Sequence, residues 1–261
     1  MLTDRQRSEA ASQLAEAERS ATPVPQLTSE WPEMNVTDAY EIQLLNIRRR
    51  VADGAVIRGH KVGLSSPAMQ QMMGVDEPDY GHLLNDMFVF ENDEVATSSL
   101  CYPRVEMEVA FVLDEGLPGG TCTAADVLRC TRFLMPAIEI IDSRIANWNI
   151  GLLDTIADNA SSCRVVLGGT ATPIDQVDIR TIGAAMERNG EIVETGSAAA
   201  VLGNPVTAVA WLANKVHAFG VTLERGHVIL PGACARAVDV HPGDNITCHF
   251  GTLGPVGVRF S

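Results

Sequence analysis

The stretch that decides the fold is RVEMEVAFV, residues 104–112. Side chains alternate between the two faces of a strand, so Glu106 and Glu108 share one face. Ala110 and Val112 continue that face with apolar side chains, which indicates that the face is interior. The stretch therefore predicts a buried strand that carries two carboxylates.

A third buried carboxylate is predicted at Glu139, in the apolar run AIEII of residues 137–141. Glu-x-Glu on a strand is more often solvated, since charges are rarely buried unpaired, but these apolar neighbours argue against that reading. Carboxylates that share a site raise the cost of ionising one another, and a divalent cation resolves the conflict. Oxygen ligands suit Mg²⁺ or Mn²⁺, whereas zinc prefers His or Cys.

Composition limits the class of protein. With 261 residues, 46% of them apolar, the chain can bury a full core as one large domain, or as one domain with a small N-terminal extension. Its net charge of -14 and lack of a basic stripe argue against nucleic-acid partners. No apolar run approaches the roughly 20 residues that span a bilayer. Scattered cysteines and a polar N-terminus predict a cytoplasmic protein without a membrane partner.

Helix signals recur along the chain. Thr37 or Asp38 is the expected cap of the second helix, and Pro136 is expected to close the fourth. Asn204 and Pro205 open the last one. The helices are predicted over residues 3–19, 37–54, 67–74, 124–134 and 204–219.

Strands dominate after Glu106. Asn189-Gly190 is the strongest hairpin signal, because this pair readily supplies the positive dihedrals of a tight primed turn. Pro242-Gly243-Asp244 predicts a second turn. Because strands and helices do not alternate regularly, we expect an α+β fold, a sheet or barrel with helices packed outside, in place of a parallel doubly wound sheet.

Two charged residues upstream are candidates for catalysis. Lys61 lies in GHKVGL, residues 59–64, and Asp79 lies in DEPDYG, residues 76–81. On pattern alone Lys61 is equally compatible with an edge-strand charge, and Asp79 with a turn. If both face the cation, Lys61 can stabilise an enolate oxygen while Asp79 or a neighbouring group moves a proton.

Other polar and large side chains carry weaker signals. Residues 158–162, DNASS, fit an ordinary turn or a set of hydroxyl and amide donors for a substrate carboxylate. The histidines have no metal-ligand spacing and most are expected on the surface or as satisfied polar groups, and the tryptophans are expected to pack. Four residues are weak candidates for the end of a substrate pocket: Met69, Met72, Met73 and Leu83.

Six segments in order resemble the 2-hydroxypenta-2,4-dienoate (2-keto-4-pentenoate) hydratases of the fumarylacetoacetate hydrolase superfamily. The segments are Gly59-x-Lys61-x-Gly63-Leu64, Gly74-Val75-Asp76-x-Pro78-Asp79-Tyr80-Gly81, Pro103-Arg104-x-Glu106-x-Glu108, Ala137-x-Glu139, Asp158-Asn159-Ala160-Ser161 and Gly203-Asn204-Pro205. The resemblance extends from about Tyr40 to Phe260. It is greatest to the hydratases of steroid-ring and aromatic meta-cleavage catabolism.

The resemblance implies roles for individual residues. Glu106, Glu108 and Glu139 would bind Mg²⁺ or Mn²⁺, and Lys61 and Asp79 would take part in proton transfer or enolate stabilisation. Ser161 and Arg104 would contact the substrate. It further implies a mixed β-sheet rolled into a barrel-like core with outer helices, divided into an N-terminal helical segment (1–54) and a catalytic domain (55–261). A homo-oligomer, in complex with a downstream aldolase, is also implied.

The implied activity is hydration of a 2-hydroxy-2,4-dienoate to a 4-hydroxy-2-oxo acid. A 4-oxalocrotonate decarboxylase is the alternative on the same scaffold. A C–C hydrolase would need a His-Glu pair to activate water, which the sequence alone does not place. A non-catalytic protein with a structural ion is a fourth reading, and Lys61, Asp79 and Ser161 argue against it, because acid, base and carboxylate-binding groups suit an open site.

Overall fold

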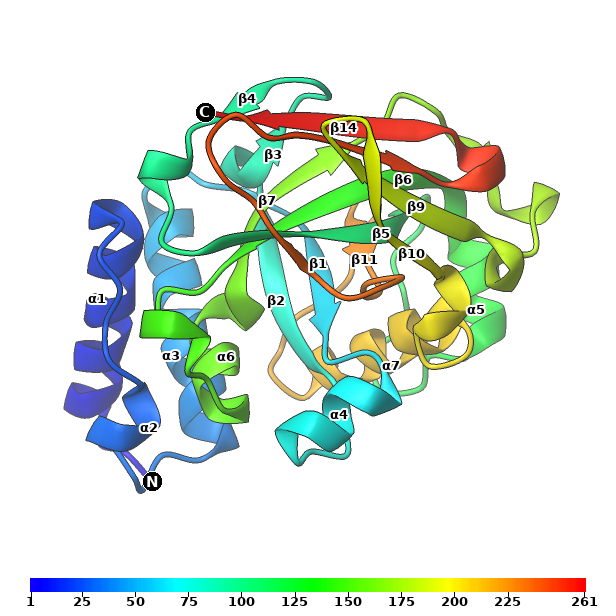
Figure 1. Cartoon of the computed structure of the whole chain (residues 1–261). Coiled ribbons are helices and arrows are strands. Elements are labelled where there is room, and N and C mark those ends of the chain that lie inside the picture. The colour runs from blue at the N-terminus through cyan, green and yellow to red at the C-terminus, as the bar shows by residue number, and fades with distance from the viewer.

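The computed structural model describes the backbone of all 261 residues and every side chain except those of Met72 and Met73. Two groups of helices flank the strands. Helices α1 (Asp4–Ser20), α3 (Val36–Ala52) and α6 (Leu152–Ala157) pack together at one end, and α5 (Ala124–Cys130) packs against α7 (Pro205–His217) (Figure 1). The short helices α2 (Leu27–Glu30) and α4 (Pro67–Met73) complete the set. No helix in the described part of the chain combines the length and apolar character needed to span a bilayer.

The strands form two sheets. The larger has the order β2-β1-β11-β5-β6-β7-β3, with β12 beside β5 and β8 beside β6, and the smaller has the order β10-β9-β13-β14-β4. The bounds are β1 (Ile57–Gly63), β2 (Asp79–Leu84), β3 (Phe88–Val89), β4 (Glu94–Val95), β5 (Pro103–Leu113), β6 (Thr131–Asp142), β7 (Ser162–Leu167), β8 (Thr172–Pro173), β9 (Gly183–Arg188), β10 (Glu191–Ser197), β11 (Val228–Leu230), β12 (Val238–Asp239), β13 (Asn245–His249) and β14 (Pro255–Phe260).

The larger sheet is mixed. Strand β1 runs parallel to β11, and β3 runs parallel to β7, whereas β5 pairs antiparallel with both β6 and β11. The smaller sheet packs over β6 and β7 through β13 and β14. The curled mixed sheet, with helices outside it and at the N-terminus, confirms the predicted α+β class.

The first long helices begin at capping boxes. Thr3 caps α1, and the Asn35 side chain accepts a hydrogen bond from Asp38 N at the start of α3. The prediction that Thr37 or Asp38 caps this helix was therefore wrong. Asp38 lies three residues inside, where its carboxylate accepts from Leu2 N and from the Arg7 guanidinium. The buried carboxylate thus ties α1 to α3, a long-range role that local capping rules do not reveal.

The predicted helix over 124–134 was wrong in its second half. Helix α5 ends at Cys130, and Thr131–Asp142 is strand β6, with Pro136 inside it. Along one edge of β6 the neighbouring strand changes. Phe133 and Leu134 pair with β8, and the residues from Ala137 onward pair with β7. Proline has no N–H to donate, so it is tolerated at this break in the ladder. Pairing with β5 along the whole strand outweighs the local helix signal.

Both predicted turns are present. Asn189 and Gly190, with φ of 56° and 86°, join β9 to β10 in the predicted hairpin. The turn at Pro242 and Gly243 joins β12 to β13, and Gly243 has a φ of 92°. Those two strands belong to different sheets, because β12 pairs with β5 and β13 pairs with β9 and β14. This second turn therefore carries the chain from one sheet to the other.

Candidate active site

Three glutamates meet where β5 and β6 pair. Glu106 of β5 lies directly opposite Glu139 of β6, and Glu108 lies two residues further along the same face of β5. One carboxylate oxygen from each lies within 4.8 Å of the others. Glu108 and Glu139 are fully buried, and Glu106 is half-buried. The ladder register therefore brings together the three carboxylates that the sequence singled out, and their role as metal ligands stays a prediction.

The carboxylates are poorly satisfied by the protein. The Oε2 atom of Glu108 accepts a hydrogen bond from Gly232 N at 2.8 Å. Among the described residues, Glu108 Oε1 and both oxygens of Glu139 have no hydrogen-bond partner. Burial, together with the other two glutamates, raises the pKa of Glu108 well above its usual range. Burial also raises the pKa of Glu106 to about 7, against the opposing effect of Lys61. A cation at this point would relieve both the repulsion and the missing contacts.

Lys61 of β1 points at this cluster. Its Nζ lies 3.4 Å from Glu139 Oε2, an ion pair without hydrogen-bond geometry, and donates a hydrogen bond to the Ala160 carbonyl at 3.0 Å. Burial acts to lower the pKa of Lys61, but the carboxylates of Glu139 and Glu106 outweigh it and raise that pKa. The ammonium therefore stays charged inside the protein. It is placed to stabilise negative charge that develops beside the glutamates.

Asp79 of β2 lies next to Lys61 because a glycine opposite leaves room for it. Gly63 pairs with Asp79, and a Cβ at Gly63 would lie 2.1 Å from Asp79 Oδ1. Burial raises the pKa of Asp79, although Lys61 partly opposes this. Neither carboxyl oxygen has a hydrogen-bond partner within the described part of the structure. Asp79 can therefore hold a proton and release it inside the site.

The loop after α6 is strained and supports the floor of the site. Asn159, Ala160 and Ser161 have φ of 54°, 51° and 55°, a left-handed conformation that costs energy for residues other than glycine. The Asn159 side chain accepts from His82 N at 2.8 Å and donates to His82 O at 3.0 Å. Of the two readings of residues 158–162, these contacts favour a structural role for the Asn159 amide, which binds the backbone of β2. Ser161 Oγ is buried and unpartnered among the described atoms.

A buried ion pair that the sequence analysis missed anchors the same loop. Arg144 Nε donates to Asp158 Oδ1 at 2.6 Å, and the guanidinium also donates to the Asp142 and Ser162 carbonyls. These contacts join the end of β6 to the start of β7. No short motif signals the pair, because its two members are 14 residues apart on different elements.

A cavity of about 450 Å³ opens over these groups. It is lined by the predicted residues Lys61, Asp79, Arg104, Glu106 and Ser161. Sequence reasoning missed Thr155, Trp148 and Arg236 in the same lining. Trp148 was expected only to pack, yet its ring lies against the guanidinium of Arg104, 4.4 Å from ring centroid to Cζ.

The four residues predicted for the end of the substrate pocket differ in their positions. Met69 lines the cavity, whereas Leu83 is fully buried and does not. The side chains of Met72 and Met73 lie outside the described residues. His60 is an exception to the expectation for most of the histidines, because it is fully buried with both ring nitrogens unpartnered among the described residues. His60 faces away from the cavity, because it precedes Lys61 on β1.

The donor set fits a hard divalent cation. Three carboxylates offer only oxygen, and unpartnered oxygens within one 4.8 Å cluster can bind a common ion. The cavity leaves further positions open for a substrate, in contrast to a closed structural site. An adjacent ammonium, a proton-holding carboxyl and a buried hydroxyl complete an arrangement suited to acid–base chemistry on an oxygen-rich acid.

Comparison with known proteins identifies the scaffold. The family model for the fumarylacetoacetate (FAA) hydrolase C-terminal region matches residues 59–261. The chain is 43% identical to a 2-keto-4-pentenoate hydratase of Paraburkholderia xenovorans over 99% of this chain and 96% of that protein. It is 41% identical to a 2-oxo-hept-4-ene-1,7-dioate hydratase of Escherichia coli, over 96% of each. The structure of 4-oxalocrotonate decarboxylase from Pseudomonas putida G7, complexed with magnesium and adipate, superposes with a TM-score of 0.96 at 40% identity, over 100% of this chain and 99% of that one.

Proposed function

Since the chain belongs to the fumarylacetoacetate hydrolase family, we propose that it is a metal-dependent hydratase of 2-hydroxy-2,4-dienoates. Water is added to give a 4-hydroxy-2-oxo acid. The observation that carries the proposal is the cluster of Glu106, Glu108 and Glu139 beside Lys61, with Glu106, Lys61 and Asp79 lining one cavity. Relatives at 41–43% identity over nearly the whole chain that are named hydratases support the same reaction class.

In this proposal the three glutamates hold Mg²⁺ or Mn²⁺. When bound, the ion supplies a Lewis acid for the carboxylate and the adjacent C2 oxygen of the substrate. Ser161, whose buried hydroxyl is unpartnered in the described structure, and Arg104 orient the substrate carboxylate. The complex of a relative with magnesium and adipate supports both the ion and a carboxylic acid ligand.

Protein side chains move the protons. The dienol is converted to its keto form by protonation at C5, and water then adds at C4, which conjugation with the C2 carbonyl makes electrophilic. The Lys61 ammonium stabilises the enolate charge in both steps. Asp79, whose pKa is raised by burial, takes and returns a proton within the cavity. The net reaction consumes one water and releases no other product.

An absorbance assay tests the proposal. The dienoate chromophore of 2-hydroxypenta-2,4-dienoate should disappear with Mg²⁺ or Mn²⁺ and persist with a chelator. The product should be the 4-hydroxy-2-oxo acid. An intact chromophore with the metal-loaded protein would reject the hydratase.

Decarboxylation is the alternative, and the TM-score of 0.96 to a 4-oxalocrotonate decarboxylase favours it over other reactions of the family. Both reactions place negative charge on the C2 oxygen, so Lys61 and the glutamates serve either. Released CO₂ from 4-oxalocrotonate, with no turnover of the five-carbon dienoate, would replace the hydratase by the decarboxylase.

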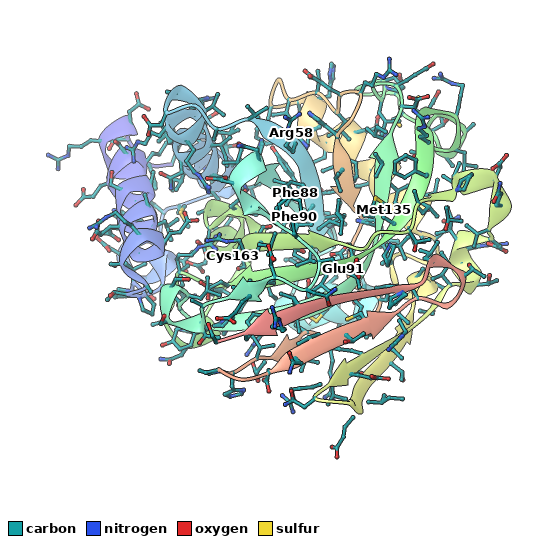
Figure 2. All side chains as sticks on the ribbon, turned by 90° about the horizontal axis from the view of Figure 1, so that it is seen from above. Arg58, Phe88, Phe90, Glu91, Met135 and Cys163 are labelled. Carbon is teal, nitrogen blue, oxygen red and sulfur yellow. The ribbon has the colours of Figure 1, made fainter. Side chains whose placement is uncertain are left out.

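We propose that the chain assembles as a homo-oligomer. Phe90 is 84% exposed, and Phe88, Met135 and Leu167 are half-buried apolar residues (Figure 2 labels the first three). Exposed apolar groups of this kind favour contact with another protein surface. Light scattering of wild type and Phe90→Ser tests this, and a monomeric wild type would reject it.

The hydratases named above also support a place in catabolism. We propose that the enzyme works in the cytoplasm on dienoates from aromatic or steroid rings, and that a downstream aldolase accepts its product. The six cysteines are free, as a reducing compartment requires. Co-purification with a 4-hydroxy-2-oxo acid aldolase would support the complex.

A further inference from the structure

We infer that the cavity selects a 2-hydroxydienoate with an uncharged aliphatic tail over one with a second carboxylate. The inference rests on the proposed function and narrows its substrate class. It concerns the part of the cavity beyond Lys61, Asp79, Glu106 and Ser161, which hold the oxygen-rich end of the substrate.

The remaining lining is mostly apolar, and besides two arginines its polar side chains are the hydroxyls of Ser65, Ser66 and Thr155. Leu64, Met69, Ile141 and Ile150 contribute aliphatic side chains, and Trp148 contributes a ring. Ala233, Ala235 and Ala237, from the segment before β12, also line the cavity. Alanines at alternate positions leave space without offering a polar contact. A terminal carboxylate placed here would lose its hydration without a new partner, which is costly.

The two arginines of the cavity already have anionic partners. Arg104 Nε lies 2.7 Å from Asp239 Oδ1, and its guanidinium also lies against the Trp148 ring. Arg236 pairs with Glu194 of β10. The hydrogen bond from Arg236 lowers the pKa of Glu194, so that carboxylate is ionised at neutral pH. Arg104 is assigned above to the C1 carboxylate, so Arg236, whose side chain is 81% exposed, is the arginine left for a tail, and a tail carboxylate there would have to compete with Glu194.

The size of the cavity suits a tail longer than hydrogen. Its volume of about 450 Å³ is larger than the volume of a five-carbon acid, and small-molecule ligands are commonly enclosed over most of their surface. Each buried methylene contributes about 0.8 kcal/mol, or about fourfold in affinity. Substrates that carry methyl or ethyl at C5 should therefore be used better than 2-hydroxypenta-2,4-dienoate.

Two matched measurements test the inference. The first compares kcat/KM for dienoates ending in hydrogen, methyl or ethyl with kcat/KM for 2-hydroxyhepta-2,4-diene-1,7-dioate. We expect a rise of about fourfold per methylene and a fall of about tenfold or more for the dioate. The second uses calorimetry on the Mg²⁺-loaded protein, with 2-oxohexanoate and 2-oxoadipate, six-carbon acids that end in a methyl and a carboxylate, respectively. The uncharged acid should bind at least about tenfold more tightly.

The two readouts separate failure of the inference from failure of the function. Turnover of the dioate at or above the rate of the alkyl dienoates, or tighter binding of 2-oxoadipate, overturns the inference and leaves the hydratase standing. Absence of turnover with all dienoates, together with tighter binding of 2-oxohexanoate, overturns the hydratase and leaves the inference standing. Absence of binding by both 2-oxo acids also overturns the inference.

A variant pair tests the role of the ion pair with Glu194. Glu194→Gln frees Arg236, and the preference for 2-oxohexanoate should shrink several-fold. The control is Glu191→Gln, which removes the same charge from an exposed residue that has no ion-pair partner among the described residues. An unchanged preference in the first variant, or an equal shift in the control, would contradict the assignment.

Discussion

Strands β1 and β2 carry a buried polar cluster on each face, and the two clusters differ in charge. Lys61 and Asp79 line the cavity with Glu106, and Lys61 pairs with Glu139. On the opposite face His60 pairs with His82, with ring centroids 4.7 Å apart, and His227 lies 5.8 Å from His60. Both clusters contain polar atoms that have no partner among the described residues.

The difference teaches which buried polar groups indicate a site. The imidazoles avoid charge, because burial lowers the pKa of His60 well below its usual value and that of His82 to about 4. His82 also bonds to Gln43 Oε1 through Nδ1, and Tyr80 stacks on Tyr40 beside it. None of these rings lines the cavity over Glu106 or the small cavity beside Arg144. Clustered carboxylates beside an open cavity, and not burial of polar atoms as such, point to function.

The largest effect is expected from Glu106→Gln. The amide keeps the shape of the side chain but removes one anionic ligand, so turnover should fall by at least about 10³-fold. Circular dichroism should show an intact fold. Full activity in this variant, assayed with saturating Mg²⁺, would reject the carboxylate cluster as the site.

Lys61→Met should lower kcat by about 10²- to 10³-fold, because the enolate loses its adjacent positive charge. The effect should fall on kcat more than on Mg²⁺ affinity, since removing Lys61 takes no ligand from the ion. A variant that lost metal affinity and kept kcat at saturating metal would contradict this role.

Gly63→Ala should lower kcat/KM by about 10- to 100-fold, because the new Cβ would displace the Asp79 carboxyl. Gly183→Ala is the matched control, since no described atom lies within 4 Å of a Cβ there. Equal activity in the two variants would show that the position of Asp79 does not matter.

The histidine face should set an acid limit on stability. The unfolded chain protonates histidine near pH 6.5, whereas native His60 stays neutral, so its contribution is lost as pH falls below about 6.5. His60→Leu should therefore gain about 2 kcal/mol relative to wild type between pH 7.5 and 5. The variant must be compared with wild type, because the raised pKa values of Glu106 and Glu108 stabilise both proteins as pH falls. Parallel pH profiles from urea unfolding would refute it.

The smallest effect is expected on catalysis by the same variant. His60→Leu should keep kcat within about twofold of wild type, because the ring faces away from the cavity. A large loss would mean that the two faces are coupled and that the contrast between them is false.

Local patterns predicted the chemistry of the site better than its geometry. Alternation in residues 104–112 placed Glu106 and Glu108 on one interior face, and the structure agrees. That Glu139 lies directly opposite Glu106 depends on strand register, which is set by packing along both strands. The sequence pattern left Lys61 and Asp79 open between catalytic and ordinary roles, and the resemblance favoured the catalytic ones. The close approach of Asp79 to Gly63 has a steric reason visible only in three dimensions.

The errors have a common physical cause. Pro136 reads as a helix end, yet pairing with β5 makes it part of a strand. The sequence predicts Asp38 as a cap, yet its carboxylate accepts hydrogen bonds from Arg7 of α1 and from Leu2 N. The histidine cluster had a usable signal, because His60 alternates with Val62 and His82 with Tyr80 on one apolar face. In each case distant contacts override a local preference.

The most direct test of the central claim is a Mn²⁺ titration followed by electron paramagnetic resonance. Wild type and His60→Leu should each bind one tight Mn²⁺ per chain, and Glu139→Gln should lose that ion while remaining folded. Equal Mn²⁺ affinity in wild type and Glu139→Gln would contradict the account, because the three carboxylates would then not share a cation.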